Sequence, residues 1–326
     1  MSELDSPEWL PPAAYDRVVV SCTARYHGSR PSRLPDRRDF RGDIAAILVD
    51  EPDHAAEVFR LLDRPGRVIY VDVERKQALD LLAIAKAVIS RSTLAHAKPN
   101  DATIRSLDVF VSHLVGADLT SMRCGVYGTG NLAFKCALLL AERNAEVHVA
   151  GRSDAAVERT VDAINAILPR HQHHPVRLWG SSSRVRLMVT AVTAQGVIGP
   201  GWLARLEQGA HVIDVGIDNL DRDFISSGLA KGLTIDRLDT RAAEGQLPVA
   251  APGFFEEVYG RADIGGVAVV SGGIVASRGT VVVDNLRHPT RIVGIANGSG
   301  GLLSVTEISP DDGERRARVE KCISSG

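Results

Sequence analysis

The stretch CGVYGTGNLAFKCALLLAERNAEVHVAGRS, residues 124–153, decides the fold. It starts with an apolar run of strand length, residues 124–127, and continues with residues 132–143, in which strong helix formers dominate. A second apolar run of strand length follows at residues 146–150. Strand, helix and strand in this order, over about 30 residues, predict a βαβ unit with two parallel strands.

Three small residues occupy the connection between the first strand and the helix. Gly128, Gly130 and Ala133 form the pattern G-x-G-x-x-A. In a dinucleotide-binding turn the first position makes the tight turn, the second lets backbone N–H groups approach a pyrophosphate, and the third lets the helix pack closely on the sheet. Glycine-rich turns also occur in proteins that bind nothing, but the surrounding βαβ pattern favours binding. The expected phosphate-binding residues are Gly128, Thr129, Gly130, Asn131 and Leu132.

The second strand is followed by Gly151, Arg152 and Ser153. An NAD-binding site usually has Asp or Glu here, about 20 residues past the glycines, to bind the ribose 2′-hydroxyl. An arginine beside a hydroxyl suits a 2′-phosphate instead, because a guanidinium forms charge-assisted, bidentate hydrogen bonds with phosphate oxygens. A solvated surface arginine is the alternative, but it leaves the missing acid unexplained. We therefore predict that these three residues contact NADP (NADPH).

The composition is that of an ordinary globular protein. The chain has 326 residues, of which 44% are hydrophobic and 24% are charged, and its formal net charge is −2. This balance predicts no basic surface for nucleic acid or an anionic membrane, so a small-molecule substrate is the expected partner. The acidic, proline-rich N-terminus, MSELDSPEWLPPAAYD, predicts a cytoplasmic protein. A homo-oligomer, in particular a homodimer, is compatible with these properties.

Neither the cysteines nor the histidines form a metal-binding motif. Cys22, Cys124, Cys136 and Cys322 lack C-x-x-C spacing, so we expect reduced residues, mostly in the core, rather than disulfides, metal ligands or nucleophiles. The segment HQHH, residues 171–174, lies in one polar loop without a nearby acid or cysteine motif. Solvent exposure is favoured there, and no metal is expected.

Strands also alternate with helices before the fingerprint. Strands are expected at residues 17–22, 44–49 and 67–73, and helices at residues 53–62, 76–89 and 101–115. The predicted fold class is α/β, with a small N-terminal α/β domain and a doubly wound Rossmann NAD(P)-binding domain. The expected parts are a flexible tail (1–14), an N-terminal substrate or catalytic domain (15–115), and a Rossmann domain with a glycine-rich C-terminal segment (116–326).

An arginine-rich segment, residues 24–43, separates the first two expected strands. A flexible surface loop is the expected structure for this composition. A lip that attracts an anionic substrate or the cofactor phosphates is the less favoured alternative. In the C-terminal glycine-rich segment, strands are predicted near Val267 and Val281.

A small α/β domain, a linking helix and a fingerprint domain in this order resemble the shikimate dehydrogenase and methylenetetrahydrofolate dehydrogenase group, whose fold is called amino-acid-dehydrogenase-like. VDVERK, residues 71–76, is similar to the V-T-x-P-x-K segment of shikimate dehydrogenases, and PND, residues 99–101, opens the linking helix as N-T-D does there. The resemblance implies that Lys76 is catalytic and that Asp101 partners it across the substrate. The serine pair that binds shikimate has no counterpart near Cys22, and the Tyr-x-x-x-Lys element of the folate enzymes is missing, so the substrate stays unassigned.

Two later segments extend the resemblance. VTAQGVIGP, residues 192–200, and HVIDVGIDN, residues 211–219, are similar to the later strands of both families and their ends, which face the nicotinamide. The resemblance implies further cofactor contacts at Ala191, Val192, Thr193, Val215 and Gly216.

Hydride transfer to or from a C=O or C=N group needs a proton donor or acceptor beside the reacting atom. A lysine whose pKa is lowered by burial, or which is held by a carboxylate, can fill that role. Lys76 could instead be a solvated lysine, Asp101 an acid that caps a helix, and Lys98 a surface residue.

We expect an NADP-dependent dehydrogenase or reductase of a small polar substrate bound in the cleft between two α/β domains. A non-catalytic NADP-binding sensor or scaffold is the first alternative. An acyl or aldehyde reductase that uses a cysteine thiol is the last, because no cysteine occupies an exposed electropositive turn by sequence.

Overall fold

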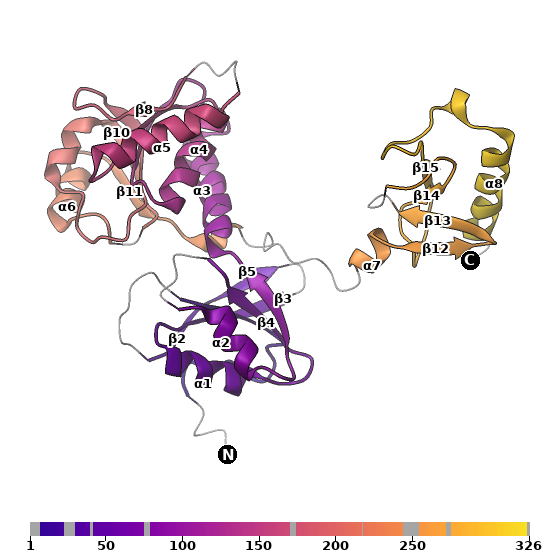
Figure 1. Cartoon of the computed structure of the whole chain (residues 1–326). Coiled ribbons are helices and arrows are strands. Elements are labelled where there is room, and N and C mark those ends of the chain that lie inside the picture. The colour runs from indigo at the N-terminus through magenta and orange to yellow at the C-terminus, as the bar shows by residue number, and fades with distance from the viewer. Residues whose placement is uncertain are drawn as a thin grey trace. The chain divides into compact units, whose positions relative to one another are not determined.

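The structure is a computed structural model that describes residues 7–22, 30–39, 42–74, 79–169, 174–216, 218–243, 254–271 and 275–324. It forms two compact units, Met1–Leu247 and Pro248–Gly326 (Figure 1). The sequence suggested that the last segment belongs with the Rossmann domain in residues 116–326. The structure instead gives it a sheet and a hydrophobic core of its own.

The first sheet of the larger unit has five strands in the order β2-β3-β1-β4-β5. Its strands are β1 (Arg17–Ser21), β2 (Ser32–Asp39), β3 (Gly42–Leu48), β4 (Val68–Asp72) and β5 (Thr93–Ala97). All neighbours are parallel except β2 and β3, which are antiparallel. Helices α1 (Pro52–Leu62) and α2 (Leu81–Val88) pack on it. In α1, Ala55, Val58, Phe59 and Leu62 are buried at helical spacing, so one apolar face covers the sheet.

Two strands of this sheet lie where the sequence predicted none. Residues 32–39 of the arginine-rich segment form the edge strand β2 rather than a loop, and residues 93–97 form β5. The charges of β2 are balanced locally, since Arg33 pairs with Asp36 and Arg38 pairs with Asp43. An edge strand exposes one side to solvent, so a charged sequence without an apolar period can still be a strand.

The second sheet has six strands, in the order β11-β10-β9-β6-β7-β8, and every neighbouring pair is parallel. Its strands are β6 (Arg123–Tyr127), β7 (Glu146–Ala150), β8 (Arg177–Leu178), β9 (Val185–Thr190), β10 (Leu206–Asp214) and β11 (Thr234–Arg237). The helices with it are α3 (Pro99–Val115), α4 (Asn131–Glu142), α5 (Asp154–Ile167), α6 (Arg222–Ala230) and the short η2 (Pro200–Arg205) and η3 (Thr240–Ala243). This strand order is that of the doubly wound dinucleotide-binding fold, which confirms the predicted fold class.

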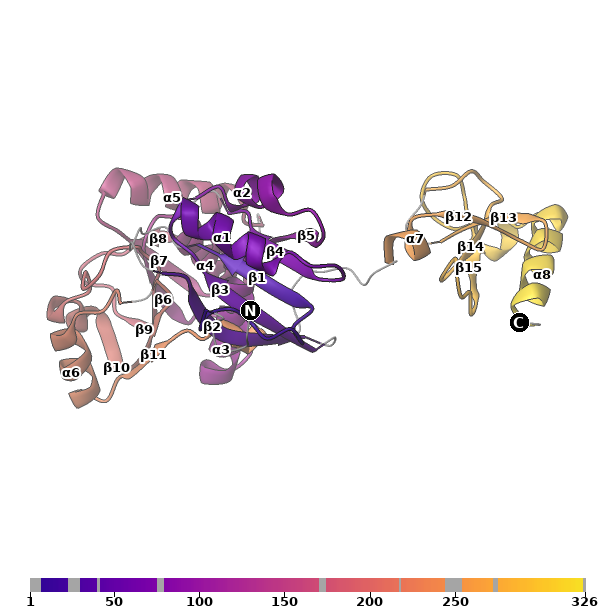
Figure 2. The same cartoon turned by 90° about the horizontal axis from the view of Figure 1, so that it is seen from below.

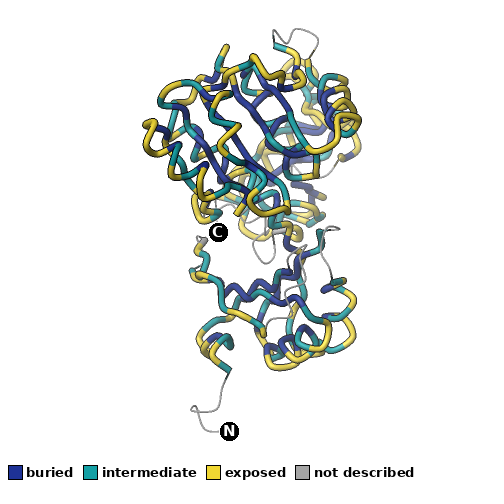
Figure 3. Tube along the Cα trace, turned by 90° about the vertical axis from the view of Figure 1, so that its left-hand side faces the viewer, coloured by how far each residue is buried: buried dark blue, intermediate teal, exposed yellow. Residues whose placement is uncertain are grey.

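The strands of this sheet are largely buried and contribute to a hydrophobic core together with α3, α4 and α5 (Figure 3). On the central strand β6, a Cβ at Gly125 would lie 2.3 Å from the Cη2 atom of Trp179. The missing side chain therefore makes room for the indole, whose Nε1 donates to the carbonyl of Ser183 at 3.0 Å. Trp202 packs edge-on against the same indole, with ring centroids 5.2 Å apart.

The smaller unit contains a four-stranded sheet in the order β12-β13-β14-β15. Its elements are α7 (Phe254–Val258), β12 (Arg261–Ile264), β13 (Val267–Ser271), β14 (Val281–Val283), β15 (Ile292–Ile295), η4 (Val305–Glu307) and α8 (Pro310–Ser324). Helix α8 packs on the sheet through Val319, which has no exposed surface (Figure 2). The strands predicted near Val267 and Val281 are present as β13 and β14.

Across the described ranges, no helix is both long and apolar enough to cross a membrane.

Candidate dinucleotide-binding site

The predicted cofactor residues all lie at the carboxyl ends of four parallel strands. Residues 128–132 follow β6, residues 151–153 follow β7, residues 191–193 follow β9, and residues 215–216 follow β10. Strands β7 and β9 flank β6 on opposite sides, so the chain reverses direction across the sheet at β6 and β9. Ligands of open α/β sheets bind at such a switch point, outside the carboxyl ends of the strands.

Gly128 shapes the turn after β6. Its φ of 140° lies in the region that favours glycine, and a Cβ there would lie 2.7 Å from the carbonyl oxygen of Ala191 and 2.8 Å from the Cβ of Ala133. Its N–H donates to the carbonyl of Ala150 at 2.8 Å. The turn is thus packed between the ends of β7 and β9 and the first turn of α4, which any side chain at this position would disturb.

Gly130 has a different environment. It is the N-cap of α4, it is exposed, and a Cβ built on it meets no atom within 4 Å. No side chain caps this helix, and the first hydrogen bond to Gly130 is donated by the N–H of Phe134. The amides of Asn131, Leu132 and Ala133 therefore begin the helix without an intrahelical acceptor. Such amides, together with the helix dipole, favour a negatively charged group in the open space at Gly130.

Arg152 comes just after β7, and the end of β7 lies next to the turn after β6. A Cβ on Gly151 would lie 3.1 Å from the Cγ2 atom of Thr129, so the residues after β7 contact the turn after β6 directly. Arg152 and Ser153 are exposed, and Ser153 is the N-cap of α5. Within the part of the chain that the structure describes, Arg152 makes no ion pair, which leaves its guanidinium available to an anionic ligand.

Asn219, the last residue of HVIDVGIDN, is a residue of this region that the sequence analysis does not select. It has no exposed surface, and its side-chain amide donates to the carbonyls of Val192 and Ala194, each at 2.9 Å, while its Oδ1 accepts from the N–H of Val192 at 3.1 Å. These bonds join the loop after β9 to the loop after β10. A Cβ on Gly216 would lie 2.1 Å from Asn219 Oδ1, so this glycine is required by the side chain of Asn219.

Asp214 supports the same loops from β10. Its carboxylate accepts from the hydroxyl of Thr190 at 3.0 Å and from the N–H of Asn219 at 3.1 Å. Burial raises the pKa of Asp214, and the hydrogen bonds from Asn219, Thr190 and Gly216 oppose that rise. Through these hydrogen bonds the buried carboxylate of Asp214 holds the end of β9 and the loop after β10 together.

Asp101, the predicted catalytic acid, lies in the first turn of α3 and pairs with a lysine of α4. The ammonium of Lys135 donates to Asp101 Oδ1, and Lys98 Nζ lies 3.4 Å from Oδ2. The hydrogen bond from Lys135 is the main reason why the pKa of Asp101 is lowered. Lys135 was not selected from the sequence. The available signal was its position as the single charged residue in the otherwise apolar run NLAFKCALLLA.

Lys76, the predicted catalytic lysine, lies outside the described residues. The chain just before it is tied to α3, because Glu74 Oε1 accepts from the N–H of Asn100 at 2.8 Å. The side chain of Asn100 in turn lies 3.5 Å from Asn131 Oδ1 at the start of α4. The end of β4, the start of α3 and the start of α4 are therefore neighbours.

The cysteines are free in this structure, and Cys22, Cys124 and Cys136 are buried as expected. Burial raises the pKa of both Cys124 and Cys136 to about 12, so neither thiol is a nucleophile at neutral pH. His171 and His173 lie outside the described residues. No cluster of His, Cys, Asp or Glu that could hold a metal ion occurs among the residues that are described.

Neither a family model nor a curated protein sequence matches this chain. Among solved structures, L-tryptophan dehydrogenase from Nostoc punctiforme is 14% identical, with a TM-score of 0.41 over 62% of this chain and 60% of that one. A shikimate dehydrogenase in complex with NADP+ is 11% identical, with a TM-score of 0.44 over 69% of this chain and 87% of that one. Dipicolinate synthase A chain from Bacillus subtilis is 13% identical, with a TM-score of 0.36 over 60% and 65% of the two chains. The chain thus spans less than two thirds of the tryptophan dehydrogenase and the synthase.

Proposed function

We propose that this chain is an NADP-dependent oxidoreductase that transfers a hydride to or from a C=O or C=N group of a small polar substrate. The observation that carries the proposal is the open space at Gly130. It lies at the uncapped start of α4, at the switch point of the strand order, which is where folds of this class bind their ligands. A pyrophosphate at this helix start would accept from the free amides of Asn131, Leu132 and Ala133.

The preference for NADP rests on Arg152. Its exposed guanidinium follows β7, where the ribose of the adenosine half is bound in this fold. A 2′-phosphate offers it charge-assisted hydrogen bonds that a 2′-hydroxyl does not. Val192, Thr193, Val215 and Gly216, at the ends of β9 and β10, are the proposed contacts of the nicotinamide half.

The cofactor proposal is tested by titrating the protein with NADPH and with NADH. Arg152→Ala should weaken NADPH binding by about ten- to a hundredfold, as expected for the loss of charged hydrogen bonds worth roughly 1.5–3 kcal/mol. NADH binding should change little. Arg159→Ala, which removes an exposed arginine of α5 further from the strand end, is the matched control. Equal or tighter binding of NADH by the unmodified protein would contradict the preference.

For the chemical step, we propose that Lys76 and Asp101 move or hold a proton at the reacting atom, with Lys135 as the residue that positions Asp101. The ion pair between Asp101 and Lys135 keeps the carboxylate charged and fixed at the start of α3. A bound substrate would exclude water from the site. The electrostatic interactions of these charged groups would then be stronger, because water no longer screens them. The lysine ammonium is the better proton donor of the two groups at neutral pH.

A non-catalytic NADP sensor is the second candidate, because Asp101 already has two lysine partners without any substrate. Lys76→Ala and Asp101→Asn distinguish the two functions. NADPH oxidation is followed with a panel of small ketones, 2-oxo acids and imines. An enzyme loses turnover in both variants and keeps NADPH affinity, whereas a sensor binds NADPH and shows no turnover in the unmodified protein.

A cytoplasmic location and a homo-oligomer belong to the same proposal. Light scattering of the purified chain tests the oligomeric state.

A further inference from the structure

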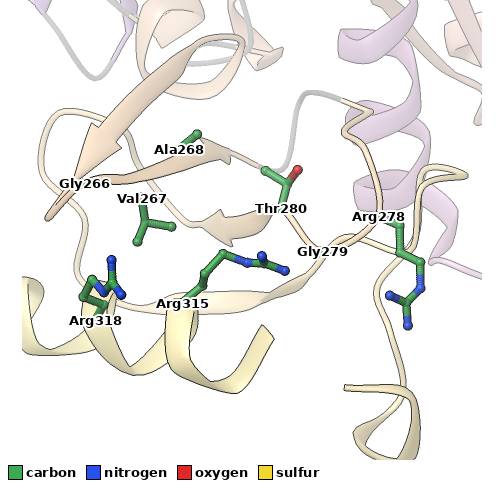
Figure 4. Close-up of a pocket in the computed structure, with 8 residues that line it drawn as sticks. All are labelled: Gly266, Val267, Ala268, Arg278, Gly279, Thr280, Arg315 and Arg318. Carbon is green, nitrogen blue, oxygen red and sulfur yellow. The ribbon is translucent and has the colours of Figure 1, made fainter. Parts of the chain in front are cut away.

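The smaller unit has a cavity of about 350 Å³ that takes no part in the proposed dinucleotide site. It is lined by the β12–β13 turn and the start of β13, by the loop of residues 278–280, and by Arg315 and Arg318 of α8 (Figure 4). Three of its lining residues are arginines, at positions 278, 315 and 318. A cavity of this size is at the lower end of the range for small-molecule sites, which is roughly 300–1,000 Å³.

Among the described residues, each of these arginines has more N–H groups than hydrogen-bond acceptors. Arg278 Nη2 donates to the carbonyl of Glu307, and Arg318 Nη2 donates to Glu314, each at 3.0 Å. Arg315 Nη2 donates to Asp312. Each guanidinium carries further N–H groups that remain available to a ligand.

Within the described part of the chain, Arg315 has one N–H group that is left without a partner. Its Nε atom is buried and has no hydrogen-bond partner among the described residues, although the side chain as a whole is 44% exposed. A buried N–H without an acceptor is unfavourable, so a shift of this side chain toward a ligand oxygen in the cavity would remove the cost.

The position of Arg315 is set by the fold before any ligand arrives. Asp312, one turn earlier on α8, is 1% exposed and also accepts from the N–H and the hydroxyl of Ser309, at 3.0 and 2.8 Å. Gly279, with φ of 85°, leaves room for this pair, because a Cβ there would lie 2.8 Å from both Arg315 Nη2 and Asp312 Oδ1. A site whose side chains are already fixed loses little conformational entropy on binding.

The unit as a whole is not basic, since residues 248–326 contain eight Arg and Lys against nine Asp and Glu. At the cavity itself three arginines face two carboxylates, since Arg278 and Arg315 share Asp312 and Arg318 pairs with Glu314. The positive excess is therefore small and local, which favours a small anion over nucleic acid. The guanidinium groups of Arg278, Arg315 and Arg318 are spread along the cavity rather than gathered at one point (Figure 4). A phosphate group suits them better than a planar carboxylate, because it carries more charge and three acceptor oxygens.

We infer that this cavity is a binding site for a small phosphate-bearing molecule, held by Arg278, Arg315 and Arg318. The site is independent of the proposed oxidoreductase function. All residues of this site belong to the smaller unit. The experiment that tests the proposal uses the complete chain.

Inorganic phosphate, glycerol 3-phosphate and acetate are titrated into the full-length protein while its backbone amide resonances are followed. We expect both phosphates to shift the amides of Gly266, Gly279 and Thr280 saturably. Arg318→Gln should weaken this binding by about tenfold or more, as for the loss of a charged hydrogen bond. Arg316→Gln removes the neighbouring exposed arginine, which does not line the cavity, and should change the affinity less than twofold. Stronger binding of the ester than of inorganic phosphate identifies a phosphorylated metabolite rather than free phosphate.

Arg315→Lys is the second variant, because it keeps the charge next to Asp312 and removes the buried Nε donor; it should also weaken binding. The proposal is overturned if the shifts are confined to residues 128–133, or if Arg316→Gln and Arg318→Gln have equal effects. Acetate binding as tight as phosphate binding would overturn the assignment to phosphate. A melting curve of each variant, compared with that of the unmodified protein, shows that the smaller unit remains folded.

Discussion

Three glycines of the candidate site differ in what a side chain would contact at their positions. At Gly128 a Cβ would meet backbone and Ala133, and at Gly216 it would meet Asn219 and the carbonyl of Val192. At Gly130 it would meet nothing. The fold therefore requires glycine at positions 128 and 216. At position 130 the fold sets no such requirement, so a bound ligand can account for the glycine there.

This contrast makes a prediction about matched substitutions. Gly130→Val should abolish NADPH binding, because the side chain fills the space proposed for the pyrophosphate, while circular dichroism and the melting temperature stay nearly unchanged. Gly128→Val should instead lower the free energy of unfolding by about 1–3 kcal/mol, through a strained φ and contacts with Ala191 and Ala133. Isothermal titration calorimetry and urea unfolding of both variants measure the two effects.

If Gly130→Val were to lower stability and leave the nucleotide affinity of the folded fraction unchanged, the turn would be structural only. The proposed function would then lose its main support.

Asn219 leads to a second prediction at this scale. Asn219→Ala leaves the N–H of Val192 and the carbonyls of Val192 and Ala194 without the side-chain partner that they have in the structure. We expect a loss of about 1–3 kcal/mol in the free energy of unfolding, because three part-buried hydrogen bonds worth about 0.5–1.5 kcal/mol each are removed and solvent replaces them in part, and weaker binding of the nicotinamide half. Asp223→Ala, at an exposed position of α6, is the control and should cost clearly less. An equal loss in both variants would contradict the bracing role of Asn219.

Among the elements, α3 and α4 are joined by the pair of Asp101 and Lys135. The ammonium lowers the pKa of Asp101 below its ordinary value of 3.8. An acid whose pKa is lower in the folded state stabilises the fold above its unfolded pKa, and this contribution disappears as the pH falls through the folded value. The two side chains are 37% and 29% exposed, so solvent screening limits the effect.

A double-mutant cycle with Asp101→Asn and Lys135→Gln measures this contribution. We expect a coupling free energy of about 0.2–1 kcal/mol at neutral pH, typical of partly exposed pairs, and a decline of this coupling as the pH is lowered below 3.8. A coupling that stays constant as the pH is lowered would contradict the ion pair. If Lys135 also positions Asp101 for catalysis, Lys135→Gln should lower kcat more than it raises KM.

Most of the elements near the site are predictable from the sequence because their signals are local. The strand at residues 146–150 agrees with the structure at both ends, and the helix at residues 132–143 agrees with α4 within one residue at each end, since an apolar run and a run of strong helix formers mark them. Strand β2 is missed because an edge strand with paired charges has no apolar period. Asn219 and Lys135 are missed because their partners lie on other elements, and no spacing in the sequence brings them together.

At the scale of the molecule, the structure separates the candidate site from the smaller unit. Every proposed cofactor residue lies between positions 128 and 216, within Met1–Leu247. The smaller unit has its own buried cluster, which includes Val269, Val281, Val283 and Val319. Neither core therefore needs residues of the other unit.

A chain that ends after Leu247 should consequently bind NADPH within about twofold of the full-length affinity, because the binding loops and their supports are intact. Calorimetry measures the affinity, and circular dichroism checks that the shortened protein is folded. Loss of binding by a folded truncated chain would show that the smaller unit contributes to the dinucleotide site.

The position of β9 beside β6 also has a consequence for the rate at which the protein forms and loses its structure. These two strands are roughly 60 residues apart in sequence, whereas β6 and β7 are joined by a single helix, so the entropy of loop closure delays the β6–β9 pair relative to the β6–α4–β7 unit. The binding site at the junction of β6 and β9 is then completed only after the folding barrier has been crossed, and on unfolding it is lost before the same barrier is reached. A dinucleotide bound there should slow unfolding and leave the folding rate almost unaltered, so that the lifetime of the native state, measured by stopped-flow fluorescence, rises with NADPH concentration.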